Sequence, residues 1–321
     1  MQTDPTSKVV QKQQQLSAIV IANPTSGTYV HFANQLKEIV SEFQRQGWQA
    51  ELCLTQQAGD AKKFAKEAVQ KQITMVVAAG GDGTINEVIQ ELAGSETSLG
   101  VIPLGTVNVW AREMKIPLDD PTRASQILMR NYTRRVDLGQ VNERYFLLMA
   151  GIGLDGKVTN AVEKRPAKKF GIVGYLFVAL WMGLGFKGFP ATLDIDGTEI
   201  KSRALQIVIG NTQLYGGAVK FTWRARADDG KLDICVVRAR GLLGRLRVIM
   251  SFLLRRKDRI QWVTYHTGER LEIQTKTPIA IQIDGDPVDF TTPATFHVVP
   301  GSLRVVIPEE VAQELLSGAK A

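Results

Sequence analysis

Two patterns of apolar and polar residues follow one another along the chain. From Ser17 to about Leu128, short β-branched runs alternate with segments whose apolar residues recur every three or four positions. The short runs predict buried strands, and the longer segments predict amphipathic helices that connect them. This alternation is typical of a doubly wound parallel sheet with helices on both faces. We expect strands at 17–24, 48–55, 73–80 and 98–105, and connecting helices at 35–47 and 60–72.

The pattern changes after Tyr132, where runs with a two-residue period are separated by Gly, Asp and Pro turns. Such runs predict an antiparallel β-sandwich. Two apolar helical segments, at 168–187 and 241–257, interrupt this part of the chain. The expected strands lie at 134–141, 144–151, 191–197, 203–211, 231–237, 270–275 and 296–300.

These patterns divide the chain into a flexible leader over residues 1–15, an α/β domain over 16–134 and a β-sandwich domain over 135–307. We expect a C-terminal helix over 308–321, and one arrangement open to it is to pack against the first domain. The glutamine-rich leader lacks the apolar core of a secretory signal, so we expect the protein in the cytoplasm.

The composition narrows the class of protein and of partner. A length of 321 residues suits two domains, and 44% hydrophobic with 22% charged residues excludes wholesale disorder and fibrous architecture. The two cysteines, Cys53 and Cys235, lie in apolar runs, which argues for reduced thiols. A net charge of +7 favours a phosphate-bearing partner. Nucleic acid is disfavoured, because the aromatic residues are not interleaved with Lys and Arg.

The most informative segment is a glycine-rich turn between an expected strand and an expected helix. Its glycines leave the backbone amides open to a polyphosphate, and the helix start adds a positive dipole end. The carboxylate in the turn can attract magnesium. The spacing matches neither the dinucleotide-binding fingerprint nor the P-loop. The alternative is a tight turn in which the aspartate only caps the helix. The turn consists of Gly80, Gly81, Asp82, Gly83 and Thr84.

Two further loops follow the first and fourth expected strands. They read NPTSG at 23–27 and PLGTVN at 103–108. The carboxyl ends of parallel strands meet at one edge of a doubly wound sheet, and ligands bind in the crevice there. We therefore expect both loops and the glycine turn to share one crevice.

With these motifs in order, the sequence resembles the diacylglycerol kinase catalytic-domain family, in its branch of bacterial soluble lipid kinases, which is related to sphingosine and ceramide kinases. GGDGT alone also occurs in NAD kinases and phosphofructokinases, whereas GGDGTINE followed by PLGTVN is far more specific. The resemblance continues through GIGLD at 151–155, NTQLYGG at 211–217, DDGKLD at 228–233 and IDGDPV at 283–288.

The resemblance implies ATP-dependent, magnesium-dependent phosphorylation of a lipid hydroxyl, with a diacylglycerol-like acceptor between the domains. For Thr55 the residues alone favour a simpler role, as a strand-end hydroxyl that satisfies its own turn. The family's nucleotide contacts fall on Asn23, Thr55, Gly80, Gly81, Asp82, Gly83, Thr84 and Thr106, with Asn108 as a neighbour.

Phosphoryl transfer also needs a carboxylate that accepts the proton of the lipid hydroxyl. The resemblance implies Asp286 as this base, although bacterial relatives usually place the longer Glu there. The alternative is that IDGD forms only a two-residue hairpin turn. Asp82 is the rival base, and we assign it to the organisation of magnesium and phosphate.

The resemblance implies a second, structural magnesium site in the DDGKLD loop. Its ligands map onto the carboxylate of Asp229 and the backbone carbonyls of Arg226 and Lys231. Oxygen ligands of this kind suit a hard cation. From the residues alone an acidic turn explains the loop equally well.

Two segments bear on membrane contact. Residues 238–259 form a basic amphipathic pattern that fits an anionic membrane surface or, alternatively, a core-packed helix with a solvated face. Residues 170–186 are uncharged and glycine-containing, and fit a buried helix, a wall of the acceptor channel or, less well, a span. We expect an enzyme that associates peripherally with the membrane. The resemblance also implies the homodimer as one possible oligomeric state. The competing classes are a kinase of a soluble acceptor such as NAD and a non-enzymatic binding module.

Overall fold

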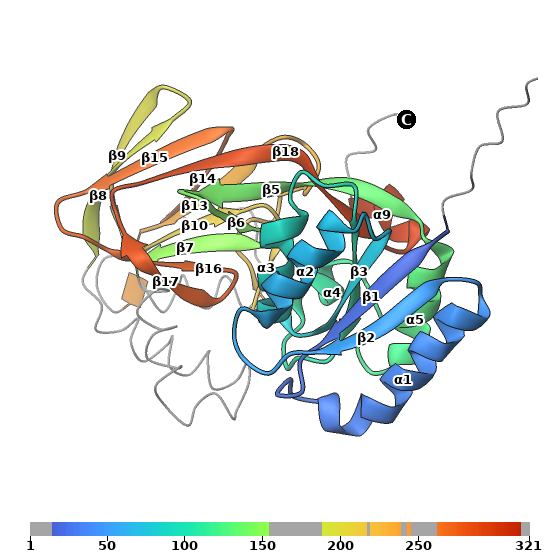
Figure 1. The fold of residues 1–321 in the computed structure, drawn as a ribbon. Helices are drawn as coiled ribbons and strands as arrows, with labels where there is room; N and C mark the ends of the chain where they lie inside the picture. The colour runs from blue at the N-terminus through green and yellow to red at the C-terminus, as the bar shows by residue number, and fades with distance from the viewer. Residues whose placement is uncertain (1–14, 154–187, 217–218, 239–242, 245–261, 316–321) are drawn as a thin grey trace, which may run out of the picture.

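The computed structural model describes residues 15–153, 188–216, 219–238, 243–244 and 262–315 (Figure 1). An α/β half and a β-rich half lie side by side. The α/β half consists of β1 (Ser17–Ala22), α1 (Tyr29–Arg45), β2 (Gln49–Leu54), α2 (Asp60–Gln70), β3 (Met75–Gly80), α3 (Asp82–Leu92), β4 (Ser98–Pro103), α4 (Val109–Glu113) and α5 (Pro121–Arg130).

The first four strands form a parallel sheet in the order β2-β1-β3-β4. The side chains of β1, β3 and β4 alternate between two buried faces, because successive residues of a strand point to opposite sides, whereas β2 at the edge of the sheet is partly exposed. Val20 and Val77 face a core shared with α1 and α5, whereas Ile19 and Val76 face a core shared with α2 and α3. Burial on both faces explains the β-branched runs of the sequence.

The β-rich half is a sandwich. Its inner sheet has the antiparallel order β14-β13-β10-β7-β16-β17. The other layer belongs to the large sheet. A third hydrophobic core, in addition to the two on the faces of the parallel sheet, fills the space between the layers. The bounds are β5 (Thr133–Val141), β6 (Arg144–Phe146), β7 (Met149–Gly153), β8 (Phe189–Ile195), β9 (Thr198–Ala204), β10 (Gln206–Gly210), β11 (Leu214–Tyr215), β12 (Val219–Lys220), β13 (Leu232–Val237), β14 (Val263–Gly268), β15 (Arg270–Thr275), β16 (Ala280–Ile283), β17 (Asp286–Thr291), β18 (Ala294–Val306) and α9 (Glu309–Leu315).

One strand joins the two halves. β18 pairs in parallel with β4 through Val305 and Leu99, and antiparallel with β5 and β15 (Figure 1). The order of the resulting sheet is β2-β1-β3-β4-β18-β15-β8-β9, with β5 and β6 branching from β18. The expected fold class, a parallel α/β unit followed by antiparallel β structure, is confirmed, and the shared strand is an addition that the sequence did not predict.

The expected domain limits remain predictions. The limit at 134 falls inside β5, which pairs with β18. Val311 and Ala312 of α9 are buried in the core that also contains residues of β3 and α3. The leader through residue 14 and nearly all of the two helical segments, 168–187 and 241–257, lie outside the described residues.

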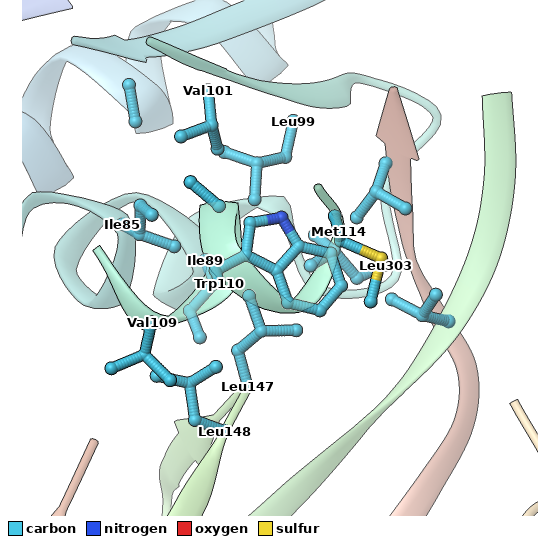
Figure 2. Close-up of a cluster of buried hydrophobic side chains, with 14 of the residues drawn as sticks. Ile85, Ile89, Leu99, Val101, Val109, Trp110, Met114, Leu147, Leu148 and Leu303 are labelled. Atoms are coloured by element: carbon cyan, nitrogen blue, oxygen red, sulfur yellow. The ribbon is translucent and has the colours of Figure 1, made fainter. Parts of the chain in front are cut away.

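The core beside the crevice is built around Trp110. Its indole is buried against Ile85 and Ile89 of α3, Leu147 and further aliphatic side chains (Figure 2). Because α3, α4 and the segment after β6 meet in this cluster, the backbone that borders the crevice has a rigid support.

Some elements differ from the expected ones. α1 begins at Tyr29, six residues earlier than predicted, since Tyr29 and Phe32 pack against the core and extend the apolar stripe. The strands β9, β14, β16 and β17 were not predicted. β9, β14 and β17 mix polar and apolar residues at partly exposed positions, and β16 is a buried strand of four residues. Among the helices of the described ranges, none is long and apolar enough to cross a membrane.

Candidate active site

Three loops meet at the carboxyl edge of the parallel sheet. The amide of Asn23 donates to the carbonyl of Ala79, 3.2 Å away, and the amide of Leu104 donates to the carbonyl of Gly80 at 2.9 Å. Thr28 connects the loop after β1 to the loop after β4, because its amide and its hydroxyl both donate to the carbonyl of Leu104. The structure thus brings together the loops that follow β1, β3 and β4.

Two glycines allow the second and third loops to touch. A Cβ atom added to Gly105 would lie 2.5 Å from Cα of Gly81, a distance that real Cβ atoms do not adopt. A Cβ atom at Gly81 would lie 3.2 Å from Cα of Gly105. The glycines are therefore needed for close approach of one backbone to the other.

The PLGTVN loop is held by its own asparagine. Asn108 adopts the left-handed conformation, with φ of 53°, which asparagine tolerates better than most residues. Its Nδ2 donates to the carbonyl of Gly105, and its Oδ1 accepts from the amide of the same residue. Thr106, between them, is exposed, and its hydroxyl lies beside Gly27.

Asp82 is the first residue of α3 and contacts the start of α4. Its carboxylate accepts hydrogen bonds from the amides of Val109, at 3.0 Å, and Trp110, at 3.3 Å. Burial raises the pKa of Asp82 above its usual range, the two amides oppose that rise, and the charge of Asp286 adds to it. The two carboxylates expected to carry the chemistry therefore lie within electrostatic reach of each other.

Asp286 reaches the glycine turn from a hairpin of the other half. Asp284 and Gly285 connect β16 to β17 with φ of 51° and 93°, the geometry of a two-residue turn with both central residues left-handed. Asp286 follows, is exposed, and its Oδ2 lies 3.7 Å from the position of a Cβ at Gly83. The hairpin expected as an alternative exists, and it presents Asp286 to the turn.

The carboxylate of Asp284 is buried and accepts four hydrogen bonds. Three come from the successive amides of Leu147, Leu148 and Met149, each at 2.9 Å, and one comes from Nδ2 of Asn86, also at 2.9 Å. Burial raises the pKa of this carboxyl, while the four donors oppose the rise. Asp284 and Asn86 both lie within motifs named above, but the sequence alone assigned a role to neither side chain.

The remaining nucleotide candidates lie on the same edge. The amide of Thr55 donates to the carbonyl of Ala22 at 3.0 Å, which places the end of β2 beside the end of β1. Asn23 uses its Oδ1 within its own loop, where it accepts from the amide and the hydroxyl of Thr25. Thr84 is buried against Gly80. All nine candidates lie at the carboxyl edge of the parallel sheet, and their contacts to nucleotide remain predictions.

The DDGKLD loop lies elsewhere, against β5 and β18. The buried carboxylate of Asp137 accepts the amides of Gly230 and Gly301, each at 2.7 Å. Asp229 is exposed and accepts the amide of Lys231 at 3.1 Å. Burial raises the pKa of Asp229, and the charges of neighbouring carboxylates raise it further.

The fit of a metal to this loop is partial. Arg226 and Lys231 are exposed at the two ends of the loop that carries Asp229. The negative charges of Asp229, Asp137 and Asp228 repel one another, and a bound divalent cation would reduce this repulsion. Within the described part of the chain, no group of three or more His, Cys, Asp or Glu side chains is arranged to hold a metal ion. The expected set would rely on one carboxylate and two carbonyls.

A buried glutamate ties α4 to the β-rich half. Glu113 accepts the amides of Gln213 and Leu214, at 3.1 and 2.9 Å, from the NTQLYGG motif. Burial raises the pKa of this carboxyl. Together with Asp284 it forms a second polar connection across the crevice, which no motif had indicated.

Comparison with known families matches both halves of the chain. A model of the diacylglycerol kinase catalytic domain matches residues 17–141. A model of the YegS C-terminal NAD kinase beta sandwich-like domain matches residues 149–307.

Individual proteins align over nearly the whole length. The chain is 30% identical over 300 residues to a diacylglycerol kinase of Bacillus subtilis (strain 168), covering 93% of this chain and 98% of that protein. It is 30% identical over 305 residues to a diacylglycerol kinase of Staphylococcus aureus (strain Newman), covering 93% and 95%. The crystal structure of a diacylglycerol kinase from Bacillus anthracis str. Sterne aligns with a TM-score of 0.71 at 22% identity, covering 94% and 100%. A further structure from that organism gives a TM-score of 0.79 at 23% identity, covering 95% and 99%.

Proposed function

This chain belongs to the diacylglycerol kinase catalytic-domain family, and from that premise we propose that it transfers the γ-phosphoryl group of ATP to the hydroxyl of a diacylglycerol. The observation that carries the proposal is the approach of Asp286, from the β-rich half, to the glycine turn of the α/β half. A phosphate-binding turn and a carboxylate that can accept a proton then face the same crevice.

The nucleotide phosphates bind at the turn of residues 80–84. α3 is an 11-residue helix whose N-terminal end carries partial positive charge. The contact between Gly81 and Gly105 keeps side chains away from the backbone amides there. Asn23 and Thr55 border the same edge and complete the nucleotide site.

Asp286 acts as the general base. It is exposed to solvent beside the glycine turn, and the Asp82 carboxylate accepts hydrogen bonds from two backbone amides at the start of α4. An acceptor hydroxyl that approaches from the β-rich half reaches Asp286 first. Asp82 then organises the charge of magnesium and phosphate, and bound magnesium supplies neutralisation of the phosphate oxygens. A structural magnesium at Asp229, with the carbonyls of Arg226 and Lys231, is proposed as a separate site.

A lipid panel tests the function. Purified protein is incubated with radiolabelled ATP, magnesium and detergent-dispersed short-chain diacylglycerol, phosphatidylglycerol, a sphingoid base or an undecaprenol-like alcohol. We expect label in the diacylglycerol product. Absence of labelled lipid, together with labelled NAD in a parallel reaction, would replace the proposal by a kinase of a soluble acceptor.

The base is tested by substitution at one strand. Asp286→Asn should lower kcat by about 100-fold with ATP affinity nearly unaltered, which is a typical contribution of a general base. Asp286→Glu should be tolerated. Asp289→Asn, three residues along the same strand and also exposed, is the matched control and should leave kcat unchanged. A loss of ATP affinity in Asp286→Asn would instead assign this residue to the nucleotide site.

Asp82→Asn should abolish turnover. The structure adds that this change also weakens the start of α4, because an amide group accepts at one atom where the carboxylate accepts at two. Thermal unfolding must therefore accompany the kinetic measurement. Full turnover at saturating ATP and magnesium would contradict the assignment.

Membrane contact rests on the basic stretch 238–259, most of which lies outside the described residues. Replacing Arg245, Arg247, Arg255 and Arg256 by Gln removes four charges, each worth about 1 kcal/mol near an anionic surface. Sedimentation with anionic vesicles should weaken by up to several hundredfold, with unchanged turnover on detergent-dispersed lipid. The control removes the same number of charges from exposed lysines of α2 and of its C-cap, Lys62, Lys63, Lys66 and Lys71. Equal sedimentation of both variants would refute membrane contact through this stretch.

A further inference from the structure

The 284–286 turn approaches α3 at two positions one helical turn apart. Oδ2 of Asp286 lies 3.7 Å from the position that a Cβ would take at Gly83, in the first turn of the helix, and Asp284 is hydrogen-bonded to Asn86, in the next turn. Residues three and four apart lie on one side of a helix, so Asp82, Gly83 and Asn86 share the side that faces the hairpin. Two contacts fix the direction of the hairpin along the helix, whereas one contact would leave it free to pivot.

The hydrogen bond between Asn86 and Asp284 has a fixed direction, with Asn86 as the donor. Nη2 of Arg144 donates to Oδ1 of Asn86 at 3.0 Å, so the amide can only turn its Nδ2 toward Asp284. Asn86 is 1% exposed, which excludes water as an alternative partner for most of its surface. The side chain therefore has one available arrangement.

The other end of the turn is anchored to the β-rich half. The amides of Leu147, Leu148 and Met149 hold both oxygens of the Asp284 carboxylate. Leu147 and Leu148 are buried in the cluster around Trp110, which also contains Ile85 and Ile89 of α3 (Figure 2). Asp284 is thus fixed to backbone that has little freedom of its own.

We propose that Asn86 and Asp284 are positioning residues, which hold Asp286 at a fixed distance from Asp82 and the glycine turn. Their role exceeds that of a general connection between the halves, because the same two elements carry the proposed base and the phosphate-binding turn. The inference rests on the proposed function, and deepens it by naming what sets the geometry of the base.

The test compares two side chains of α3. Asn86→Ala removes the donor to Asp284. Gln90→Ala, one turn further along, removes the two hydrogen bonds of 3.0 Å between Gln90 and the backbone of Tyr145, so it also weakens the contact between α3 and β6. A displacement of about 1 Å at a reacting group can cost on the order of 100-fold in rate. With short-chain diacylglycerol, Asn86→Ala should lower kcat by about 10- to 100-fold with KM for ATP within about threefold, and Gln90→Ala should retain kcat.

A reciprocal exchange provides the rescue. Asn86→Asp alone sets two carboxylates against each other, and Asp284→Asn alone places an amide NH2 against backbone donors. The double variant Asn86→Asp/Asp284→Asn restores one donor and one acceptor across the contact, and should recover part of the kcat lost in either single variant. Thermal midpoints of all variants identify any that fail to fold.

The outcomes separate the inference from the proposed function. No lipid product from the wild type would refute the function. A wild type that is active while Asn86→Ala and Gln90→Ala behave alike, or while the exchange gives no recovery, would overturn the inference. Crystal structures of the two alanine variants give a readout without turnover: the 284–286 turn should be displaced from α3 in Asn86→Ala and should remain in place in Gln90→Ala. An undisplaced turn in Asn86→Ala would also overturn the inference.

Discussion

Replacing Gly105 by alanine should separate the two glycine-bearing loops of the crevice. The added Cβ would lie 2.5 Å from Cα of Gly81 and 2.6 Å from Oδ1 of Asn108. Carbon atoms in contact lie about 3.5 to 4.0 Å apart, so the loops must move by about 1 Å. Asn108 cannot withdraw without losing its hydrogen bonds to the backbone of Gly105.

The expected magnitude follows from this overlap. Overpacking of a rigid contact costs about 1 to 3 kcal/mol, and alanine returns about 0.4 to 1 kcal/mol by restricting the unfolded chain. We therefore expect a loss of about 1 to 2 kcal/mol in the free energy of unfolding. Because the moved backbone carries the amides to which we assign phosphate binding, kcat/KM for ATP should fall by about 100-fold.

Steady-state kinetics with ATP measures kcat/KM, calorimetric titration with a non-hydrolysable ATP analogue measures nucleotide affinity, and thermal unfolding measures stability. Gly268→Ala is the control, since its Cβ would lie 2.6 Å from Cγ2 of Ile195, in the sandwich core. It should destabilise the protein and leave nucleotide affinity intact. If Gly105→Ala binds the analogue as tightly as the wild type, or if both variants lose affinity equally, the reasoning from loop contact is wrong.

Three further substitutions probe buried and exposed carboxylates. Burial, reinforced by a neighbouring carboxylate, raises the pKa of Asp233 to about 7. The folded state then binds the proton more tightly than the unfolded state does, so stability falls as pH rises from about 4 to 7. In EDTA the free energy of unfolding of Asp233→Asn should exceed that of the wild type above pH 7, by up to about 4 kcal/mol, and match it near pH 4. Glu113→Gln should cost about 1 to 3 kcal/mol in denaturant unfolding, because one of two buried backbone amides loses its acceptor. Glu96→Gln should change stability by less than about 1 kcal/mol at any salt concentration, although it removes ion pairs to Arg135 and Arg304, since Glu96 is exposed.

The sequence was sufficient for the parallel sheet and for its loops. Strands buried on both faces show as β-branched runs, and the carboxyl ends of such strands share an edge, so the meeting of the glycine turn with PLGTVN followed from topology alone. Asn86 had a local signal that was not used: it stands four residues after Asp82 in a helical pattern, and so on the same side of the helix.

Other features had no local signal. The left-handed turn at Asp284 and Gly285 is encoded by the dipeptide, whereas the amides that bind the Asp284 carboxylate come from a segment more than one hundred residues earlier. β18 is a similar case. Its alternation of buried and partly exposed residues predicts a strand, but nothing in that segment indicates which strands it pairs with. Pairing over such separations depends on which edges the rest of the fold leaves open.

The position of β18 has a consequence for biosynthesis. The strand closes the edge of β4, yet it is synthesised long after β4. Until then, the nascent α/β half presents a free parallel edge, the kind of edge that recruits other extended chains. The two halves therefore mature together, and a fragment that ends at Val141 should require a chaperone or aggregate where the full chain folds.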